Sequence, residues 1–286
     1  MKRRRFLQIV AGACATAGGA MAAEWQGQVM GADARILLRG GPASRAVVDQ
    51  VLAEIRLVED TLSLYRDSEL TRLNRDGGGA ASPLMQQAMD LALQVHEATG
   101  GAFDPLVQGQ WLQLAQGQAP RPLSASFARI AHKGGVRLRP GQQLTFNGLA
   151  QGLATDRVAA LPALRDMGGV LVDMGEARAL GADFQLGLSD PQAGMLGQLT
   201  LRPGQAIATS SPGALRFAGG ESHILGPQGQ PPLWSTVSVQ ADSAALADAA
   251  ATAFVLLPRP AMKMAAARLG VGPVRLVDFD GNLDQL

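Results

Sequence analysis

The sequence predicts an α+β fold, in which helices pack against mixed, largely antiparallel sheets. Two observations predict this class. Helix-like segments, with apolar residues at every third or fourth position, are interspersed among strand-like segments in which apolar residues alternate. In the second half of the chain, several strand-like segments follow one another as antiparallel strands do. Hydrophobic residues make up 47% of the 286 residues and aromatic residues only 4%, so Leu, Val and Ala must fill the core.

The first half of the chain is expected to begin with a strand and two helices. Gly31 interrupts the alternating pattern of the strand. Ser44 is a suitable N-cap for the first helix, and Gly100 and Gly101 end the second. The expected elements are a strand at 26–39, helices at 44–64 and 83–99, a glycine-rich loop at 76–79 and a Gln/Gly/Pro-rich connector at 113–122.

The second half is expected to be rich in strands, with three further helices. Pro162 lies inside the first helical segment and should kink or divide it, because proline lacks the N–H that continues a helix. Pro258 ends the alanine-rich second helix. The expected elements are strands at 136–139, 143–146, 170–173, 184–188, 197–201, 205–209, 234–240 and 274–279, and helices at 152–167, at 243–257 and from Ala261.

Residues 1–22 have the features of a cleaved export signal, which leaves 23–286 as the mature chain. The order Arg3-Arg4-x-Phe6-Leu7 is typical of a twin-arginine signal. A Gly/Ala-rich apolar stretch follows and ends in a small-x-small cleavage site. A membrane anchor is disfavoured because the stretch is shorter than the ~20 residues of a span. A lipid anchor at Cys14 is disfavoured because no large aliphatic residue stands three positions before it. We therefore expect a periplasmic protein without a transmembrane span.

The composition and the missing motifs exclude several function classes. Removal of the signal, with its four positive charges, changes the net charge from +1 to −3, which leaves no basic surface for nucleic acid. Cys14 is the only cysteine, so the mature chain has no disulfide, thiolate metal site or cysteine nucleophile. The chain has no Gly-x-Gly-x-x-Gly, Walker or Gly-x-Ser-x-Gly motif, and its three histidines are far apart in sequence. Zinc and serine hydrolases are therefore disfavoured.

The most informative short segment is the alanine-rich stretch that contains Asp248 and Thr252. Their spacing of four residues places a carboxylate and a hydroxyl on one face of the expected helix, one turn apart. Two hard oxygen donors without bulky neighbours suit Mg²⁺, which usually completes its shell with water and phosphate oxygens. The alternative is an alanine-rich core helix whose aspartate forms only local interactions.

A series of motifs then stands in a recognisable order along the chain. These are Met30-Gly31-Ala32, the segment 62–74, Gly101-Ala102-Phe103-Asp104-Pro105, the segment 147–156 that begins Asn147-Gly148, Ala208-Thr209-Ser210 followed by Ser222-His223-Ile224, and Ala247-Asp248 through Thr252. In this order the motifs resemble the ApbE family, the periplasmic FAD:protein FMN transferases. The resemblance covers nearly the whole mature chain and implies the two-lobed fold of that family.

The resemblance implies a Mg²⁺-dependent transfer of FMN from FAD to a Thr or Ser hydroxyl of an exported or membrane target flavoprotein, with release of AMP. The family's usual targets are respiratory electron-transfer subunits, and nothing in the sequence selects one of them. Positioning and charge neutralisation should dominate such a phosphoryl-group exchange, and a metal would act on the pyrophosphate as a Lewis acid. The sequence does not determine whether the metal is Mg²⁺ or Mn²⁺, which residue is the general base, or the oligomeric state.

The resemblance also implies roles for individual residues. Asp248 and Thr252 match metal ligands, and a backbone carbonyl near Gly148 matches a third. His223 either donates to a phosphate or acts as a base, and Asp248 is counted with it as catalytic. The positions matched to FAD contacts are Met30, Tyr65, Asn74, Ala102, Phe103, Asp104, Thr145, Gln151 and Ile224.

Several of these residues also admit purely structural roles. Met30 and Phe103 are also suitable as apolar residues of the core, and Tyr65 is suitable at the end of a helix. Asp104 and Asn74 can stabilise a turn, and His223 can lie in a surface loop. The chain also departs from the family pattern. Thr145 replaces a common Asp, Gln151 a common Lys, Met174-Gly175-Glu176 the usual Gly-Gly-Asp, and Gly226 a common Asp. These departures leave two alternatives open, namely an FAD pyrophosphatase that yields FMN and AMP, and a non-catalytic periplasmic FAD-binding protein.

Overall fold

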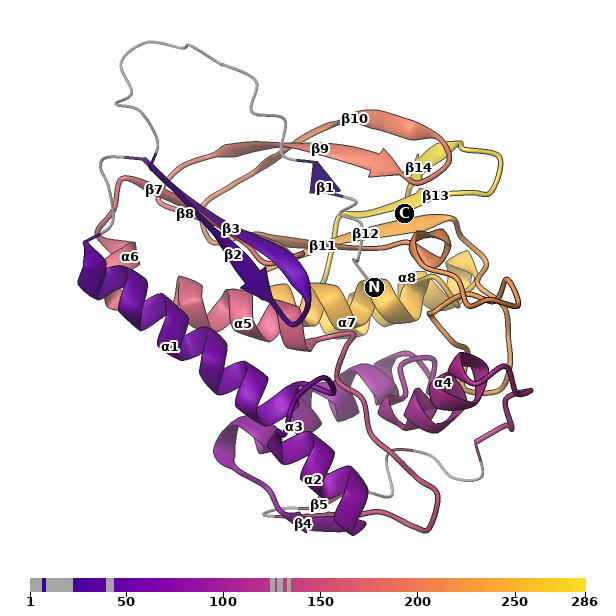
Figure 1. The fold of residues 1–286 in the computed structure, drawn as a ribbon. Helices are drawn as coiled ribbons and strands as arrows, with labels where there is room; N and C mark the ends of the chain where they lie inside the picture. The colour runs from indigo at the N-terminus through magenta and orange to yellow at the C-terminus, as the bar shows by residue number, and fades with distance from the viewer. Residues whose placement is uncertain (1–6, 9–22, 40–43, 124–126, 128–130, 133–134) are drawn as a thin grey trace.

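The fold places a layer of helices against one face of a large twisted sheet and a β-hairpin against the other (Figure 1). The computed structural model describes residues 7–8, 23–39, 44–123, 127, 131–132 and 135–286. Most of the expected export signal lies outside these residues. Within the described part, no helix is both long and apolar enough to cross a membrane. The expected α+β class, with packed helices and antiparallel sheets, is confirmed.

The large sheet has eight strands, and every neighbouring pair is antiparallel. Its inner strands are buried on both faces, which explains their continuous apolar character. In spatial order the strands are β14 (Leu283–Gln285), β13 (Val274–Val277), β12 (Thr236–Ala241), β11 (Ala206–Ser210), β8 (Ala177–Leu180), β7 (Gly169–Asp173), β3 (Ala32–Arg39) and β2 (Ala23–Val29).

The helical layer is formed by α1 (Arg45–Leu62), α5 (Ala150–Ala159), α6 (Pro162–Arg165), α7 (Ala244–Phe254) and α8 (Arg259–Leu269). Helices α5 and α7 pack so closely that a Cβ added to Gly152 would lie 2.5 Å from the carbonyl oxygen of Ala244. Only glycine fits at that position, and the alanines of α7 allow the same close approach along its length. Pro162 divides the helical segment 152–167 into α5 and α6, as expected.

The remaining helices lie on the far side of this layer, together with a small three-stranded sheet (Figure 1). The helices are α2 (Glu69–Asp76), α3 (Pro83–Ala98) and α4 (Gln108–Ala115), and the strands are β4 (Gly78–Ala80), β5 (Ala131–His132) and β6 (Gly135–Arg137). A capping box at Ser68 and Thr71 starts α2 as a helix separate from α1. The main apolar core continues from this region to the large sheet.

The opposite face of the sheet carries the hairpin of β9 (Phe184–Asp190) and β10 (Gly194–Leu201). Leu186, Leu199 and Leu201 of the hairpin pack with Leu171 and Ile207 of the large sheet in a second, smaller core. The short strand β1 (Leu7–Gln8) pairs with the other edge of β9.

Several sequence expectations about elements are wrong. The single strand expected at 26–39 is instead the antiparallel hairpin of β2 and β3, because the chain turns at Met30 and Gly31, which both have positive φ. The residues 69–76 form the separate helix α2, and β4 begins inside the loop expected at 76–79. The segment 143–146 is not a strand, because the side chain of Asn74 takes both backbone hydrogen bonds of Leu144. Helix α4 begins at Gln108, whereas only an irregular connector from residue 113 was expected. Strand β8 was not expected, because its four residues are too short for a clear alternating pattern.

Candidate active site

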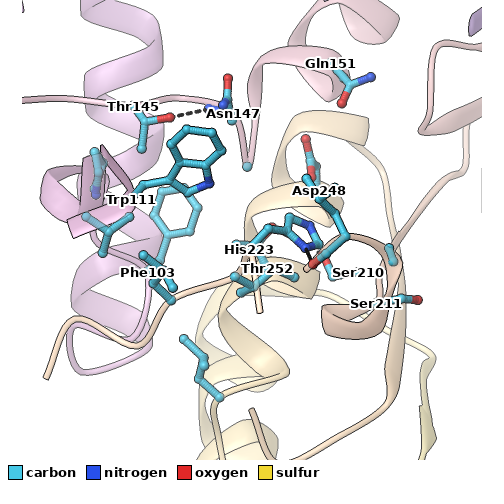
Figure 2. Close-up of a pocket in the computed structure, with 18 of the residues that line it drawn as sticks. Phe103, Trp111, Thr145, Asn147, Gln151, Ser210, Ser211, His223, Asp248 and Thr252 are labelled. Atoms are coloured by element: carbon cyan, nitrogen blue, oxygen red, sulfur yellow. Dashed lines mark hydrogen bonds between the residues drawn. The ribbon is translucent and has the colours of Figure 1, made fainter. Parts of the chain in front are cut away.

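A pocket lies where α7, the end of β11, the turn before α5 and the segment 102–111 meet (Figure 2). It brings together motifs that are far apart in the sequence. Its polar and charged lining residues are Asp104, Gln108, Thr145, Asn147, Gln151, Glu176, Thr209, Ser210, Ser211, His223, Asp248 and Thr252. Phe103 and Trp111 supply aromatic surface (Figure 2). Such a combination of apolar wall and converging polar groups is typical of a ligand site.

Helix α7 is held in place at its N-terminus by two side chains. The hydroxyl of Ser243 accepts the backbone N–H of Leu246 as an N-cap. The carboxylate of Asp156, from α5, accepts the N–H groups of Ala244 at 2.9 Å and Ala245 at 3.0 Å. A negative charge at this end also complements the helix dipole. Asp156 thereby fixes the position of α7, and with it the side chains that α7 presents to the pocket.

Asp248 and Thr252 both line the pocket from α7, one turn apart, as their spacing predicts. Gly148 faces Thr252, since a Cβ added to Gly148 would lie 3.0 Å from Thr252 Oγ1. Ser210 Oγ lies 3.3 Å from the same hydroxyl oxygen. The structure therefore gathers a carboxylate, two hydroxyls and a glycine backbone in one part of the pocket. A side chain at residue 148 would fill the space between them.

This donor set fits a hard cation such as Mg²⁺. Within the described part of the chain, no cluster of three or more His, Cys, Asp or Glu side chains could hold a metal ion by itself. A metal held here would therefore rely on Asp248, Thr252, backbone oxygen near Gly148 and oxygens of water or substrate. Mg²⁺ commonly takes few protein ligands in this way, whereas zinc usually takes three or four nitrogen or sulfur ligands.

His223 enters the pocket from a hairpin after β11 (Figure 2). Its ring Nδ1 lies 3.0 Å from the carbonyl oxygen of Leu215, and its backbone N–H donates to the same oxygen at 3.2 Å. A carbonyl oxygen can only accept, so Nδ1 carries the proton. In the neutral ring the lone pair is then on Nε2, the form that a general base requires.

Gln151 and the segment 174–176 form the wall of the pocket at the start of α5. Gln151 Nε2 donates to the carbonyl oxygen of Met174 at 2.9 Å. Gly175 has φ +106°, and a Cβ there would lie 3.0 Å from Gln151 Nε2. The glutamine amide thus binds the backbone of this loop, and Glu176 adds a buried carboxylate to the lining.

The aromatic wall rests on a buried network around Asp104. Its Oδ1 accepts the N–H of Leu106 at 2.9 Å, and burial raises the pKa of this carboxyl group. His96 Nδ1 lies 2.8 Å from the carbonyl oxygen of Phe103. Trp111 makes an edge-to-face contact with Phe217, with ring centroids 5.1 Å apart. Phe103 and Trp111 are therefore held in place beside the polar groups.

Three residues matched to FAD contacts do not line the pocket. Met30 is buried in the core with φ +50°, and its N–H donates to Glu59 Oε1 at 3.0 Å. Tyr65 is 62% exposed. Asn74 binds the backbone of Leu144, directly before Thr145. The other ten site residues that the sequence singled out do line it, namely Ala102, Phe103, Asp104, Thr145, Gly148, Gln151, His223, Ile224, Asp248 and Thr252. Ligand contacts for all thirteen stay predictions.

Sequence reasoning missed several residues at the site. Trp111 was missed because α4 was not expected and a tryptophan in a Gln-rich segment carries no motif. Ser211 was missed although it directly follows the Ala208-Thr209-Ser210 motif. The role of Asp156 had one available signal, its place at the end of the 147–156 motif, but its partners on α7 are 88 and 89 residues away.

Fold and pocket together define an α+β protein with an oxygen-rich site beside an aromatic wall. The sequence profile of the ApbE family matches residues 30–272, and the chain belongs to this family. A protein of Rhodobacter capsulatus named FAD:protein FMN transferase is 32% identical over an alignment of 232 positions, and the match covers 70% of this chain and 43% of that protein. The chain thus spans less than half the length of this curated relative.

Solved structures show the same fold. The apo form of the flavinyl transferase ApbE of Pseudomonas stutzeri is 25% identical, with a TM-score of 0.74 over 94% of this chain and 95% of that one. The ApbE protein of Thermotoga maritima is 21% identical, with a TM-score of 0.80 over 93% and 97% of the two chains.

Proposed function

We propose that this protein transfers FMN from FAD to a Thr or Ser hydroxyl of a target protein in a Mg²⁺-dependent reaction that releases AMP. One observation carries the proposal, the convergence of Gly148, Asp248, Thr252 and His223 on one pocket. Membership in the ApbE family and the names of its relatives support it. FAD is the donor substrate, and the aromatic surface of Phe103 and Trp111 suits one of its ring systems.

The oxygen donors and the histidine have separate tasks in this reaction. Asp248, Thr252 and backbone oxygen near Gly148 would hold Mg²⁺, which when bound supplies charge neutralisation and Lewis-acid activation at the pyrophosphate. His223 Nε2 accepts the proton of the attacking hydroxyl, while Leu215 fixes the ring through Nδ1. Asp156 maintains the position of α7, so that the two donors on this helix keep their spacing.

Two alternatives use the same pocket. An FAD pyrophosphatase would use water as the acceptor and form FMN and AMP without a target protein. A non-catalytic FAD-binding protein would bind FAD and form no AMP. The donor set on α7 favours a reaction, since binding of FAD alone does not require a metal.

The test measures AMP release from FAD by residues 23–286 with Mg²⁺, with and without a peptide that carries an acceptor threonine. A transferase releases AMP only with the peptide, which gains the mass of FMN. Release without peptide indicates the pyrophosphatase, and tight FAD binding without release indicates the binding protein. Asp248→Ala should lower the rate at least about 100-fold and abolish its Mg²⁺ dependence. Asp166→Ala, an exposed change outside the pocket, is the matched control.

We also propose export to the periplasm by the twin-arginine route, with residues 1–22 as the signal and an exported or membrane flavoprotein, such as a respiratory electron-transfer subunit, as target. The sequence order Arg3-Arg4-x-Phe6-Leu7 supports this location. Replacing both arginines by lysine should retain the full-length precursor in the cytoplasm. Fractionation of cells that express either form, followed by mass measurement of the periplasmic protein, tests the route and the cleavage site.

A further inference from the structure

A second cavity of about 450 Å³ adjoins the candidate active site. Five prolines line it, and we refer to it as the proline groove. Its lining includes Pro120, Pro122, Pro212, Pro231 and Pro232, with Leu114 of α4 and Phe279 beside them. Ile224 and Leu225 line both the proline groove and the active-site pocket. The two cavities therefore share a wall, and that wall includes the residue next to His223.

The shared wall is the end of a short hairpin, which contributes residues to both cavities. His223 binds back to Leu215, and Arg216 forms a bridge with Ser222. His223 lines the pocket, whereas Ser222 lines the groove. His223 and Ile224 lie in a bend directly after the bridge residue Ser222. A chain that lies in the proline groove would thus contact Ile224 and Leu225, which also line the pocket beside His223.

The walls of the groove are held together before any partner binds. The buried Gln110 donates from Nε2 to the carbonyl oxygens of Arg121 at 2.9 Å and Pro227 at 3.2 Å. It thereby links the connector after α4 to the loop after His223. The N–H of Gly229 donates to the carbonyl oxygen of Gly226 at 2.8 Å and closes that loop. A preformed groove lowers the entropic cost of binding an extended chain.

We propose that the proline groove binds the acceptor protein, as an extended segment next to the Thr or Ser that receives FMN. The inference rests on the proposed function and adds a place for the second substrate. The hydroxyl oxygen of the bound segment forms a bond to the FMN phosphorus, and the bond from this phosphorus to the bridging oxygen breaks. The hydroxyl proton goes to His223 Nε2, and the bridging oxygen leaves with AMP. Both substrates must therefore reach His223, FAD from the pocket and the acceptor from the groove.

The lining of the groove also indicates the chemistry of the acceptor segment. Prolines have no backbone N–H to donate, but they retain carbonyl oxygens that accept from an extended peptide. Apart from the side chains of Arg216 and Glu221, the described lining is uncharged. We infer that apolar or small residues flank the acceptor hydroxyl. The metal donors and the aromatic wall, which suit FAD, lie in the other cavity.

The experiment uses two synthetic peptides, each with one central threonine, flanked either by alanine and valine or by aspartate. Residues 23–286 are loaded with FAD and Mg²⁺, and AMP release and FMN mass on the peptide are measured against peptide concentration. The variants are Phe279→Asp and Pro231→Asp, both at exposed positions of the groove. Met264→Asp is the control, because Met264 is 58% exposed and lies outside both cavities, whereas Phe279 is 51% exposed.

The proposal expects FMN transfer to the apolar-flanked peptide. The half-saturating concentration of this peptide should rise at least about tenfold in both groove variants, with the Kd for FAD unchanged, while Met264→Asp behaves as wild type. The proposal is overturned if the half-saturating concentration of this peptide is unchanged in both groove variants. If the groove variants bind FAD more weakly, the groove binds FAD and the proposal is wrong. If the wild type self-associates in a concentration-dependent way and only the groove variants lose this, the groove binds a second copy of the chain and the proposal is also wrong. FAD cleavage without FMN transfer to either peptide, or no cleavage at all, contradicts the proposed function itself.

Discussion

Asp156 on α5 caps the first turn of α7 by accepting the N–H of Ala244 at 2.9 Å, across 88 residues of sequence. The same carboxylate accepts the hydroxyl of Ser243 and pairs with Arg178. One side chain therefore links α5, α7 and the edge of β8. Since Asp248 and Thr252 follow on α7, the geometry of the proposed metal site depends on a residue that does not line the pocket.

Replacing Asp156 by Asn should loosen this arrangement. The amide keeps one acceptor oxygen but loses the charge that faces the helix N-terminus and Arg178. We expect the free energy of unfolding to fall by about 1–2 kcal/mol and the affinity for Mg²⁺ to weaken. Urea denaturation and titration with Mg²⁺ measure the two effects. The exposed Asp166→Asn serves as control, and equal urea midpoints for both variants would contradict this role of Asp156.

Replacing Gly148 by Ala should impair the proposed metal site directly. The added Cβ would lie 3.0 Å from Thr252 Oγ1 and 3.2 Å from Phe103 Cε2, closer than most real contacts of this kind. We expect at least about tenfold weaker Mg²⁺ binding, measured by calorimetry. Gly109→Ala is the matched control, because its Cβ would meet only a carbonyl oxygen at 3.6 Å. Equal Mg²⁺ affinity in both variants would place the metal elsewhere.

The carboxyl group of Asp190 should contribute to the stability of the fold in a pH-dependent way. Burial alone would raise its pKa, but hydrogen bonds from Ser235, Thr236 and two backbone N–H groups lower the pKa below its usual value. A carboxyl group with a lowered folded-state pKa stabilises the fold above its unfolded-state pKa of about 3.9. This contribution disappears as the pH falls through the folded-state pKa. Asp190→Asn should therefore lower the free energy of unfolding by about 1–3 kcal/mol at pH near 7.

The difference between wild type and Asp190→Asn should shrink as the pH falls below about 4. Urea denaturation at pH near 7 and at a pH below about 4 measures this difference in the free energy of unfolding. Asp166→Asn is again the exposed control. The change also reaches the pocket, since Thr236 donates to Asp190 and lies 2.7 Å from Ser211 Oγ. A stability difference that is the same at both pH values would show that the charge of Asp190 does not contribute.

The variant Asn74→Ala tests whether Asn74 has a structural role or contacts the ligand directly. The asparagine exchanges two hydrogen bonds with the backbone of Leu144, at 2.7 and 2.9 Å. Their loss should lower the free energy of unfolding by about 1–3 kcal/mol and weaken FAD binding by displacing the turn at 145–148. Thermal denaturation and FAD titration test both, with the exposed Gln116→Ala as control. Weaker FAD binding at unchanged stability would favour the direct contact that the family resemblance implies.

The elements that the sequence predicted well are those with strong local signals. The long amphipathic segments of α1 and α3 have N-capping serines, and both helices form near the expected bounds. The segment 143–146 shows the opposite case. Its alternating pattern is compatible with a strand, but a partner 70 residues away in sequence takes its hydrogen bonds. Local propensity cannot predict such a long-range partner.

The sequence by itself determined the fold class, the ApbE family and the spacing of Asp248 and Thr252, because helical periodicity and ordered motifs are local properties of the chain. Only the tertiary structure decided which distant residues face this pair. It placed Gly148 and His223 at the same pocket, Tyr65 at an exposed position and Asn74 against Leu144. It also revealed the proline groove, whose lining comes from segments more than 160 residues apart in sequence. Close packing of sheet and helices brings these segments together, and no local pattern encodes that contact.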